Sequence, residues 1–493
     1  MKPKHFLSFL AIFLILFFLF YIGLFYYQLN TNPNTTHLSF TKKFYKLKDN
    51  RIKEIGDNNK IIILSGSNSH LSINSELIEK RFNLSVVNLA YWIDNDLNFY
   101  YYQLKDILKP GDIVIMPLEF PYYYRESMTK NFMNEMMIWG EEIYINKLSY
   151  YDLLTFIISV EPKRILDGVF TRIHNKKGYK TISYQEIDKI SKKLFKDGNI
   201  EINKETIITK RGDIIIDSYY QDTKLTGYIK KQKVSDYFLQ KFHKIEDLIS
   251  KNGAKLILTY PVTIRSEKFD LNKKKFQNQI DDFEKNLRNN NIKISCNAGL
   301  SNIDRLFCFN SPNHLTKYGR EIRTKNLLSC LDKIINNNDN NISFTEALKM
   351  TKVLEIEYKD SVKPTPIHYY KTRYKDLLNI KDALHKYYLD HGSYPKSKGF
   401  DGLYTNWGMQ SKHWIKNLSP KYIHELPRDP RNTTNPGNQY LYKSNGKDYK
   451  LISHHPEDCN LVRKEKPDFI DKKRQNYRHC NAYGFWTRGA IKW

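Results

Sequence analysis

Cysteine is scarce in this sequence, with five in 493 residues, and no two have the Cys-x-x-Cys spacing typical of a structural zinc site. We therefore expect no zinc site and no cofactor. In an oxidising compartment, Cys459 and Cys480 are close enough in sequence to form a disulfide. Cys296 and Cys308 are a second candidate pair by the same argument, which leaves Cys330 over.

Charge is absent from residues 6–27, FLSFLAIFLILFFLFYIGLFYY, a run of about the 20 residues needed to cross a bilayer. Lys2, Lys4 and His5 precede the run, which places the N-terminus in the cytoplasm by the positive-inside rule. No small-x-small cleavage site follows, so we expect an uncleaved anchor. The sequence predicts a single-pass protein of the bacterial inner membrane with most of the chain outside the cytoplasm.

Acidic residues are outnumbered, because 79 Lys and Arg face 53 Asp and Glu and give a formal charge of +26. Such a charge usually raises nucleic acid as a partner. A chain that lies outside the cytoplasm is not expected to bind nucleic acid. The charge instead meets anionic lipid headgroups or acidic envelope glycans, or it reflects a lysine-rich composition with solvated faces.

Short apolar runs alternate with amphipathic stretches beyond residue 58 and predict an α/β fold, a parallel sheet covered by helices on both faces. The expected strands are residues 60–64, 84–89, 113–118 and 255–260. The expected helices are residues 75–82, 95–108, 234–251, 273–289 and 317–335. The predicted divisions are a tip and anchor (1–28), a polar basic stalk (29–57), the α/β domain (58–335) with an insertion at about 120–235, a linker (336–364) and a C-terminal domain (365–493).

The stretch that points to chemistry is IIILSGSNSHLSINS, residues 61–75, an aliphatic strand followed by a turn of small polar residues and a helix. This order presents a serine hydroxyl at the C-terminal edge of a sheet. Ser67 is the candidate nucleophile, and Ser69 is its rival two residues later. Far downstream, His314 in FNSPNHLTKYGREIRT (309–324) is the available base.

These two stretches resemble the SGNH (GDSL-type) hydrolase superfamily over about residues 58–335. Ser65-Gly66-Ser67-Asn68 matches the family's first block, and His314-Leu315-Thr316 with Gly319 matches its last. The resemblance implies a three-layer α/β fold in which Ser67 is the nucleophile and His314 the general base. It also implies hydrolysis or transfer of an ester-linked acyl group.

The sequence departs from the family at the groups that support this pair. Asn88-Leu89-Ala90 stands where the family has Asn-Leu-Gly, so the resemblance implies the Ala90 N–H as an oxyanion donor. The third block, Met116-Pro117-Leu118-Glu119, lacks the family's asparagine, and Asn68 is a possible substitute. The place of the aspartate that orients the histidine holds Asn310 or Ser311, and Asp304 is a further candidate.

The C-terminal residues 365–493 differ in character. They contain an amphipathic helix at 370–390, the segment LPRDP at 426–430, and alternating strands around Asn445-Gly446 that predict a hairpin. This order resembles the globular part of type II secretion pseudopilins and type IV pilin-like proteins. Because an enzyme-like domain stands where a pilin has its assembly helix, we expect a binding or docking module with a protein partner. Four aromatic residues either stack on sugars or fill a small core: Trp407, Trp414, Trp486 and Trp493.

The sequence thus predicts a membrane-anchored serine esterase or O-acyltransferase that acts on ester groups of a cell-envelope or secreted glycan. The alternative is a catalytically degenerate scaffold that binds glycan or serves envelope assembly or secretion. The missing asparagine and aspartate favour the alternative.

Overall fold

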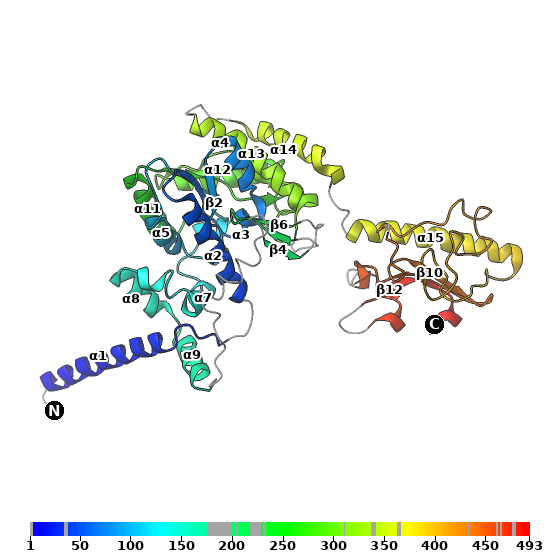
Figure 1. Ribbon diagram of the computed structural model, residues 1–493, viewed down its shortest axis with the longest axis horizontal. Helices are drawn as coiled ribbons and strands as arrows, with labels where there is room; N and C mark the ends of the chain where they lie inside the picture. Colours follow the sequence, from blue (N-terminus) through cyan, green and yellow to red (C-terminus); the bar gives the residue numbers. More distant parts are fainter. Residues whose placement is uncertain are drawn as a thin grey trace. The chain divides into compact units, whose positions relative to one another are not determined.

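The computed structural model divides the chain into two compact units, Met1–Val362 and Lys363–Trp493 (Figure 1). The structure describes residues 3–33, 38–174, 200–203, 206–216, 228–229, 233–309, 311–336, 342–361, 366–431, 433–459, 462–463, 466–475 and 480–493. Each unit has its own hydrophobic core.

The first unit is built on a four-stranded parallel sheet of order β2-β1-β3-β7. The strands are β1 (Lys60–Ile63), β2 (Ser85–Asn88), β3 (Ile113–Met116) and β7 (Lys255–Leu258). The chain leaves β1 to form β2 on one side and β3 on the other. The C-terminal end of β1 therefore lies at the switch point, where open α/β sheets bind their ligands.

The two faces of the sheet belong to two different cores. On β1, Ile61 and Ile63 pack with Leu327 and Leu331 of one helix layer, whereas Ile62 lies in the larger core on the opposite face. The first face is covered by α4 (Ser75–Phe82) and α13 (Lys317–Ile335). The second is covered by α5 (Leu97–Lys105) and α11 (Asp236–Lys251), and α12 (Lys274–Arg288) adds to the same core. The structure thus confirms a mixed α/β fold with a parallel sheet (Figure 1).

The segments predicted as a stalk and a linker each contain a helix packed on this unit. The expected stalk contains α2 (Leu38–Ile55), which buries Phe44 and Leu47. The expected linker contains α14 (Phe344–Tyr358), where the Thr351 hydroxyl accepts a hydrogen bond from Asn326 of α13 at 2.8 Å. Both segments are rich in lysine. Their apolar residues recur at helical spacing but form only a narrow face, which is difficult to recognise in the sequence.

In its described residues the insertion contains packing helices and a small antiparallel sheet. Its helices are α6 (Phe120–Tyr123), α7 (Lys130–Trp139), η1 (Ile145–Lys147), α8 (Tyr150–Ser159) and α9 (Pro162–His174). Its strands are β4 (Ile200–Asn203), β5 (Thr206–Ile208) and β6 (Ile214–Ile216). Shorter elements of the unit are α3 (Ser67–Ser72), β8 (Thr263–Ile264), η2 (Ala298–Ser301), β9 (Asn302–Ile303), η3 (Arg305–Phe307) and η4 (Lys359–Ser361).

The N-terminal helix α1 (Pro3–Tyr27) contains a segment, Phe6–Tyr27, that is long and apolar enough to cross a membrane. Its side chains from Phe6 to Phe20 are largely exposed, whereas Phe25 is fully buried in the first unit. These properties fit a membrane-anchored protein whose anchor ends inside the folded unit.

The second unit packs one long helix, α15 (Pro366–His391), against an antiparallel sheet of order β10-β11-β12. The strands are β10 (Tyr440–Ser444), β11 (Tyr449–His454) and β12 (Ala482–Trp486). β10 and β11 form the expected hairpin, with Gly446 at φ +98° in the turn. The described residues of the unit also form the short 3-10 helices η5 (Pro467–Phe469), η6 (Lys472–Arg474) and η7 (Arg488–Ala490).

One of the two expected disulfides is confirmed and the other is wrong. Cys459 pairs with Cys480 as expected. Cys296 pairs with Cys330 of α13 and leaves Cys308 buried as a free thiol. Proximity in sequence misled here, because α13 returns along the sheet and brings Cys330 within 5.7 Å of Cys296 between Cα atoms.

Candidate functional site

Ser67 lies at the C-terminal end of β1, as the first residue of α3. The turn before it requires glycine at position 66, because there is no space for a side chain. A Cβ on Gly66 would lie 2.8 Å from the Cα of Ile93 and would also collide with the Glu119 carboxylate. This crowded turn sets Ser67 at the switch point of the sheet, where a ligand is expected.

His314 reaches Ser67 from the other end of the domain. Its Nε2 lies 2.8 Å from the Ser67 Oγ, within hydrogen-bond distance. His314 sits in the loop between η3 and α13, where its N–H donates to the Ser311 carbonyl at 3.3 Å. Gly319 lets α13 begin close to this loop, because a Cβ there would lie 2.7 Å from the Phe307 carbonyl oxygen. The structure therefore brings together the two residues predicted as nucleophile and base.

Burial lowers the pKa of His314 to about 4. The imidazole is consequently neutral at neutral pH. A neutral ring nitrogen can accept a proton from a serine hydroxyl, which an imidazolium cannot.

Glu119 holds the turn that carries Ser67, a role that the sequence did not reveal. Its carboxylate accepts hydrogen bonds from the N–H groups of Gly66 at 2.9 Å and Asn68 at 3.1 Å, on either side of Ser67. It also accepts from the Ser65 hydroxyl at 2.8 Å. Its only signal in the sequence is its position at the end of the third block, where a polar side chain is expected.

A second buried charge, Arg323 of α13, lies on the other side of this turn. Its guanidinium donates to the carbonyl oxygens of Asn68 at 3.1 Å and Tyr260 at 3.3 Å. Burial lowers the pKa of Arg323 to about 9, and the charge of Glu119 opposes that shift. Glu119 and Arg323 thus bind the turn from its N–H and its carbonyl sides.

Asn68, the predicted substitute oxyanion donor, is hydrogen-bonded to the turn that carries Ser67. Its amide nitrogen donates to the Ser65 hydroxyl at 2.5 Å and to the Pro117 carbonyl at 2.8 Å. Its amide oxygen accepts from the N–H of Val262 at 3.3 Å, and the residue is fully buried. Both amide protons are therefore hydrogen-bonded within the protein, and the role of Asn68 as an oxyanion donor stays a prediction.

Ala90 follows β2 beside the end of β1, as predicted, and is held at both of its polar groups. Its N–H donates to the Asn88 side-chain oxygen at 3.1 Å. Its carbonyl accepts from the buried Lys48 ammonium and from Nδ1 of His70 at 3.1 Å. The Lys48 ammonium lies 3.9 Å and 4.3 Å from the ring centres of Phe44 and Tyr91. Burial lowers the pKa of Lys48 and of His70, and the charge of Lys48 adds to the shift at His70.

The remaining candidates are two serines, an aspartate and an asparagine. Ser69 is fully buried, and its hydroxyl has no hydrogen-bond partner among the described residues. The Ser311 hydroxyl accepts from the N–H of Asn313 at 3.3 Å. The Asp304 carboxylate caps Leu306 and lies 3.5 Å from Arg265. Asn310 lies outside the described residues.

A buried ion pair ties the insertion to the site. Asp213 accepts hydrogen bonds from Ser75 Oγ at 2.6 Å, Asn88 at 2.8 Å and Arg320 at 2.9 Å. Asp213 therefore joins β6 to α4, β2 and α13. Arg320 directly follows Gly319, so this arginine was visible in the histidine stretch, whereas its partner in the insertion was not.

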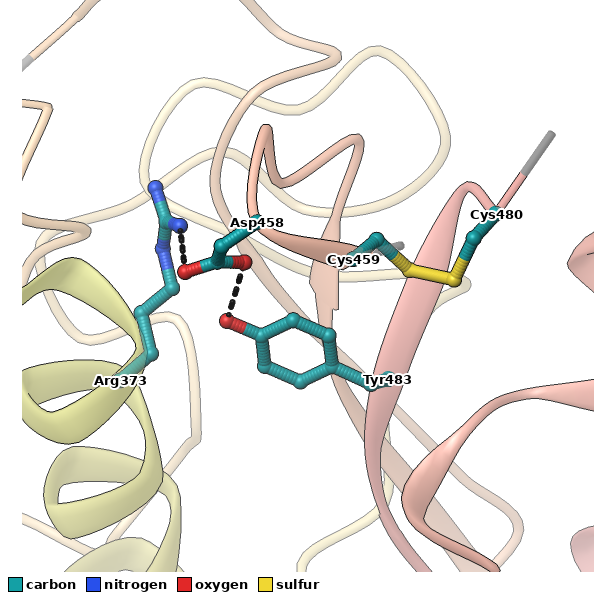
Figure 2. Close-up of a disulfide and its surroundings, with 5 residues drawn as sticks. All are labelled: Arg373, Asp458, Cys459, Cys480 and Tyr483. Carbon is teal, nitrogen blue, oxygen red and sulfur yellow. Dashed lines mark hydrogen bonds and ion pairs between the residues drawn. A yellow bond between two sulfur atoms is a disulfide. The ribbon is translucent and has the colours of Figure 1, made fainter. Parts of the chain in front are cut away.

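The second unit has its own buried charge cluster, around Arg373 of α15. Its guanidinium donates to Asp458 at 2.7 Å and to both carboxylate oxygens of Asp429 at 2.9 and 3.1 Å. Figure 2 shows Asp458 between Arg373 and Tyr483, whose hydroxyl donates to it at 2.8 Å, next to the Cys459–Cys480 disulfide. Burial raises the pKa of Asp458 to about 6, although Arg373 opposes the shift. Asp429 of the LPRDP segment and Asp458 thus both pair with Arg373.

Of the four tryptophans, Trp414 is buried in the second unit's core and Trp407 is 51% exposed. Trp486 and Trp493 are half-buried. No group of three His, Cys, Asp or Glu side chains within the described ranges is arranged to hold a metal ion.

Comparison with known families bears on the second unit. Residues 369–463 match the family of Type II secretion system (T2SS), protein G. A search of curated proteins finds no match to the chain. The pseudopilin-like nature of the C-terminal region is therefore confirmed, and it points to protein partners of the kind found in a secretion system.

Proposed function

We propose that the first unit is a membrane-anchored serine esterase or O-acyltransferase of the SGNH type, facing the outside of a bacterial inner membrane. Its substrate would be an ester-linked acyl group on a cell-envelope or secreted glycan. The observation that carries the proposal is the 2.8 Å approach of His314 Nε2 to Ser67 Oγ at the switch point of the sheet.

The reaction follows from this geometry. Neutral His314 accepts the hydroxyl proton while Ser67 Oγ attacks the ester carbonyl and forms a tetrahedral intermediate. Collapse of the intermediate breaks the bond to the alcohol, which leaves with the proton from His314, and the acyl group remains on Ser67. Water then releases the acyl group as an acid, or a sugar hydroxyl accepts it as a new ester.

The oxyanion would be stabilised by backbone N–H groups. The Ser67 N–H stands at the start of α3, where no intrahelical acceptor exists, and it has no partner among the described residues. The Ala90 N–H is the second donor. To serve the oxyanion it either breaks its hydrogen bond to the Asn88 side-chain oxygen or shares its proton between that oxygen and the oxyanion. The negative charge of Glu119 does not oppose the oxyanion strongly, because the turn and Arg323 balance it.

One observation favours the alternative, a catalytically inactive scaffold that binds glycan or serves envelope assembly or secretion. Both side-chain and backbone donors predicted for the oxyanion, Asn68 and Ala90, are hydrogen-bonded within the protein. The pseudopilin-like second unit fits either function, since it would dock the first unit to a protein partner.

The test is turnover of acetyl esters by the full chain in detergent. The full chain is needed because Phe25 and Leu29, at the end of α1, belong to the core of the first unit. We expect turnover that is lost in Ser67→Ala and in His314→Ala and retained in the matched control Ser159→Ala, an exposed serine of α8. Equal turnover in all four proteins would rule out the Ser67–His314 mechanism.

A further inference from the structure

The helices α8 and α9 each present an outer apolar face that nothing in the described part of the chain covers. On α8 the exposed residues are Tyr150, Tyr151, Leu154 and Ile158, whose exposed fractions range from 41% to 95%. Residues 151, 154 and 158 follow the three- and four-residue spacing of one helix face. A soluble protein rarely leaves such a face open to water.

On α9 the exposed residues are Leu166, Phe170 and Ile173, at 46%, 57% and 52% exposure. They too share one face by their spacing. The opposite side of α9 buries Ile165 and Gly168 against the rest of the unit. Each helix therefore has an inner face that packs and an outer apolar face that does not.

Both helices contact the C-terminal end of α1. The Tyr21 hydroxyl donates to the carbonyl of Val160, between α8 and α9, at 3.1 Å. The ring of Phe25 lies 6.1 Å from that of Phe156 of α8. Figure 1 shows α8 and α9 flanking this end of α1.

Arg164 and Arg172 of α9 complete these contacts. Arg164 donates to the Gln28 side chain at 2.8 Å, and Arg172 donates to the carbonyl of Tyr27. The attachment is thus made by buried packing and by several hydrogen bonds.

The length of α1 puts these contacts at the membrane surface. The 22 residues Phe6–Tyr27 rise about 33 Å at 1.5 Å per residue, against a hydrocarbon core of about 30 Å. With Phe6 at one boundary of the hydrocarbon, the other boundary falls near Phe25 to Tyr27, and Tyr21 lies about 8 Å inside it. The helices α8 and α9, which pack against these residues, therefore lie at the same depth relative to the membrane.

We propose that the outer apolar faces of α8 and α9 insert into the headgroup region of the bilayer beside α1. The occupant is lipid because α8 and α9 both pack against the end of the predicted membrane helix α1. Tyr150, Tyr151 and Phe170 are aromatic types that favour this interface, and Lys163 and Arg172 suit anionic headgroups. The first unit then rests on the membrane at a fixed height and tilt, because α1 and two interfacial helices fix more than one point. This proposal does not depend on catalysis by Ser67.

The experiment uses the full chain in vesicles of phosphatidylcholine and phosphatidylglycerol, with an environment-sensitive fluorophore on single introduced cysteines. The labelled variants are Ile158→Cys and Phe170→Cys. The matched control is Val353→Cys, on α14 of the same unit and 58% exposed. The native free thiol, Cys308, is buried, so we expect the fluorophore to react with the introduced cysteine and not with Cys308.

We expect nitroxide-labelled lipids to quench the fluorophore at positions 158 and 170, with blue-shifted emission, and to leave position 353 unaffected. Aqueous iodide should quench in the reverse order. Iodide quenching at 158 and 170 equal to that at 353 would overturn the proposal, because the faces would be in water. Protection from both quenchers would also overturn it, because a protein, such as a second copy of the chain, would then cover the faces.

Discussion

The carboxylate of Glu119 accepts the backbone N–H of Gly66 at 2.9 Å, one residue before Ser67. The same carboxylate accepts the N–H of Asn68, one residue after it. The buried Glu119 carboxylate therefore positions Ser67 through hydrogen bonds to the residues on either side of it.

The variant Glu119→Gln tests this support. The amide keeps one acceptor oxygen but replaces the other by an NH₂ group, which cannot accept from an N–H. A lost hydrogen bond to a charged group costs about 1.5–3 kcal/mol. We expect a lower Tm in thermal unfolding and at least about a tenfold loss of turnover, since 1.4 kcal/mol corresponds to tenfold. The exposed Glu142→Gln is the control, and equal behaviour of the two variants would contradict the role of Glu119.

The pH dependence of turnover follows from the lowered pKa of His314. Its pKa is lowered to about 4 by burial, so the neutral base is present above that value and is lost as the pH falls through it. We expect the acid limb of kcat/KM to have its midpoint near pH 4, with a plateau above it. Circular dichroism at each pH separates loss of the base from unfolding. A midpoint near the ordinary histidine value of about 6.5 would contradict the burial of the ring.

Lys48 positions the Ala90 segment. Its ammonium and His70 both donate to the Ala90 carbonyl, next to the N–H that we assign to the oxyanion. Lys48→Met keeps the volume and removes the charge. Because burial disfavours the charged form of Lys48, removing the charge should leave Tm unchanged or raise it. We expect turnover to fall about tenfold, by the loss of one charged hydrogen bond. The exposed Lys53→Met is the control, and a fall in Tm with unchanged turnover would assign Lys48 to stability alone.

The disulfide between Cys296 and Cys330 closes a loop with a sequence separation of 34 residues. In the chain-entropy account such a closure stabilises by about 3–4 kcal/mol. We expect Cys330→Ser to lower the unfolding midpoint clearly and Cys308→Ser to leave it nearly unchanged, because Cys308 forms no disulfide. Peptide mapping without reduction should find the 296–330 link, and a 296–308 link would contradict the structure.

The fold was predictable where apolar periodicity is strong. The expected strands, and the expected helix at 317–335, agree with β1, β2, β3, β7 and α13 to within two residues at every end. Helices α2 and α14 were not predicted, because lysine-rich segments with a narrow apolar face resemble solvent-exposed linkers in sequence.

Within the site, the residues recognisable from local motifs were Ser67 and His314, and the structure places them together. The groups that depend on tertiary contacts were not predictable. Glu119 acts on a turn more than 50 residues away in sequence, and Asp213 meets Arg320 across more than 100 residues. The Asn68 amide could be assigned to the turn only once its neighbour Pro117 was seen beside it.

The most direct test of the central claim is covalent modification of Ser67 by an alkyl fluorophosphonate, located by mass spectrometry on the full chain in detergent at neutral pH. If His314 activates Ser67, the adduct forms on Ser67 in the native protein, is lost in Ser67→Ala, and forms far more slowly in His314→Ala. An adduct on another serine, or a rate at Ser67 that does not change in His314→Ala, would contradict the Ser67–His314 pair as the nucleophile and base of this protein.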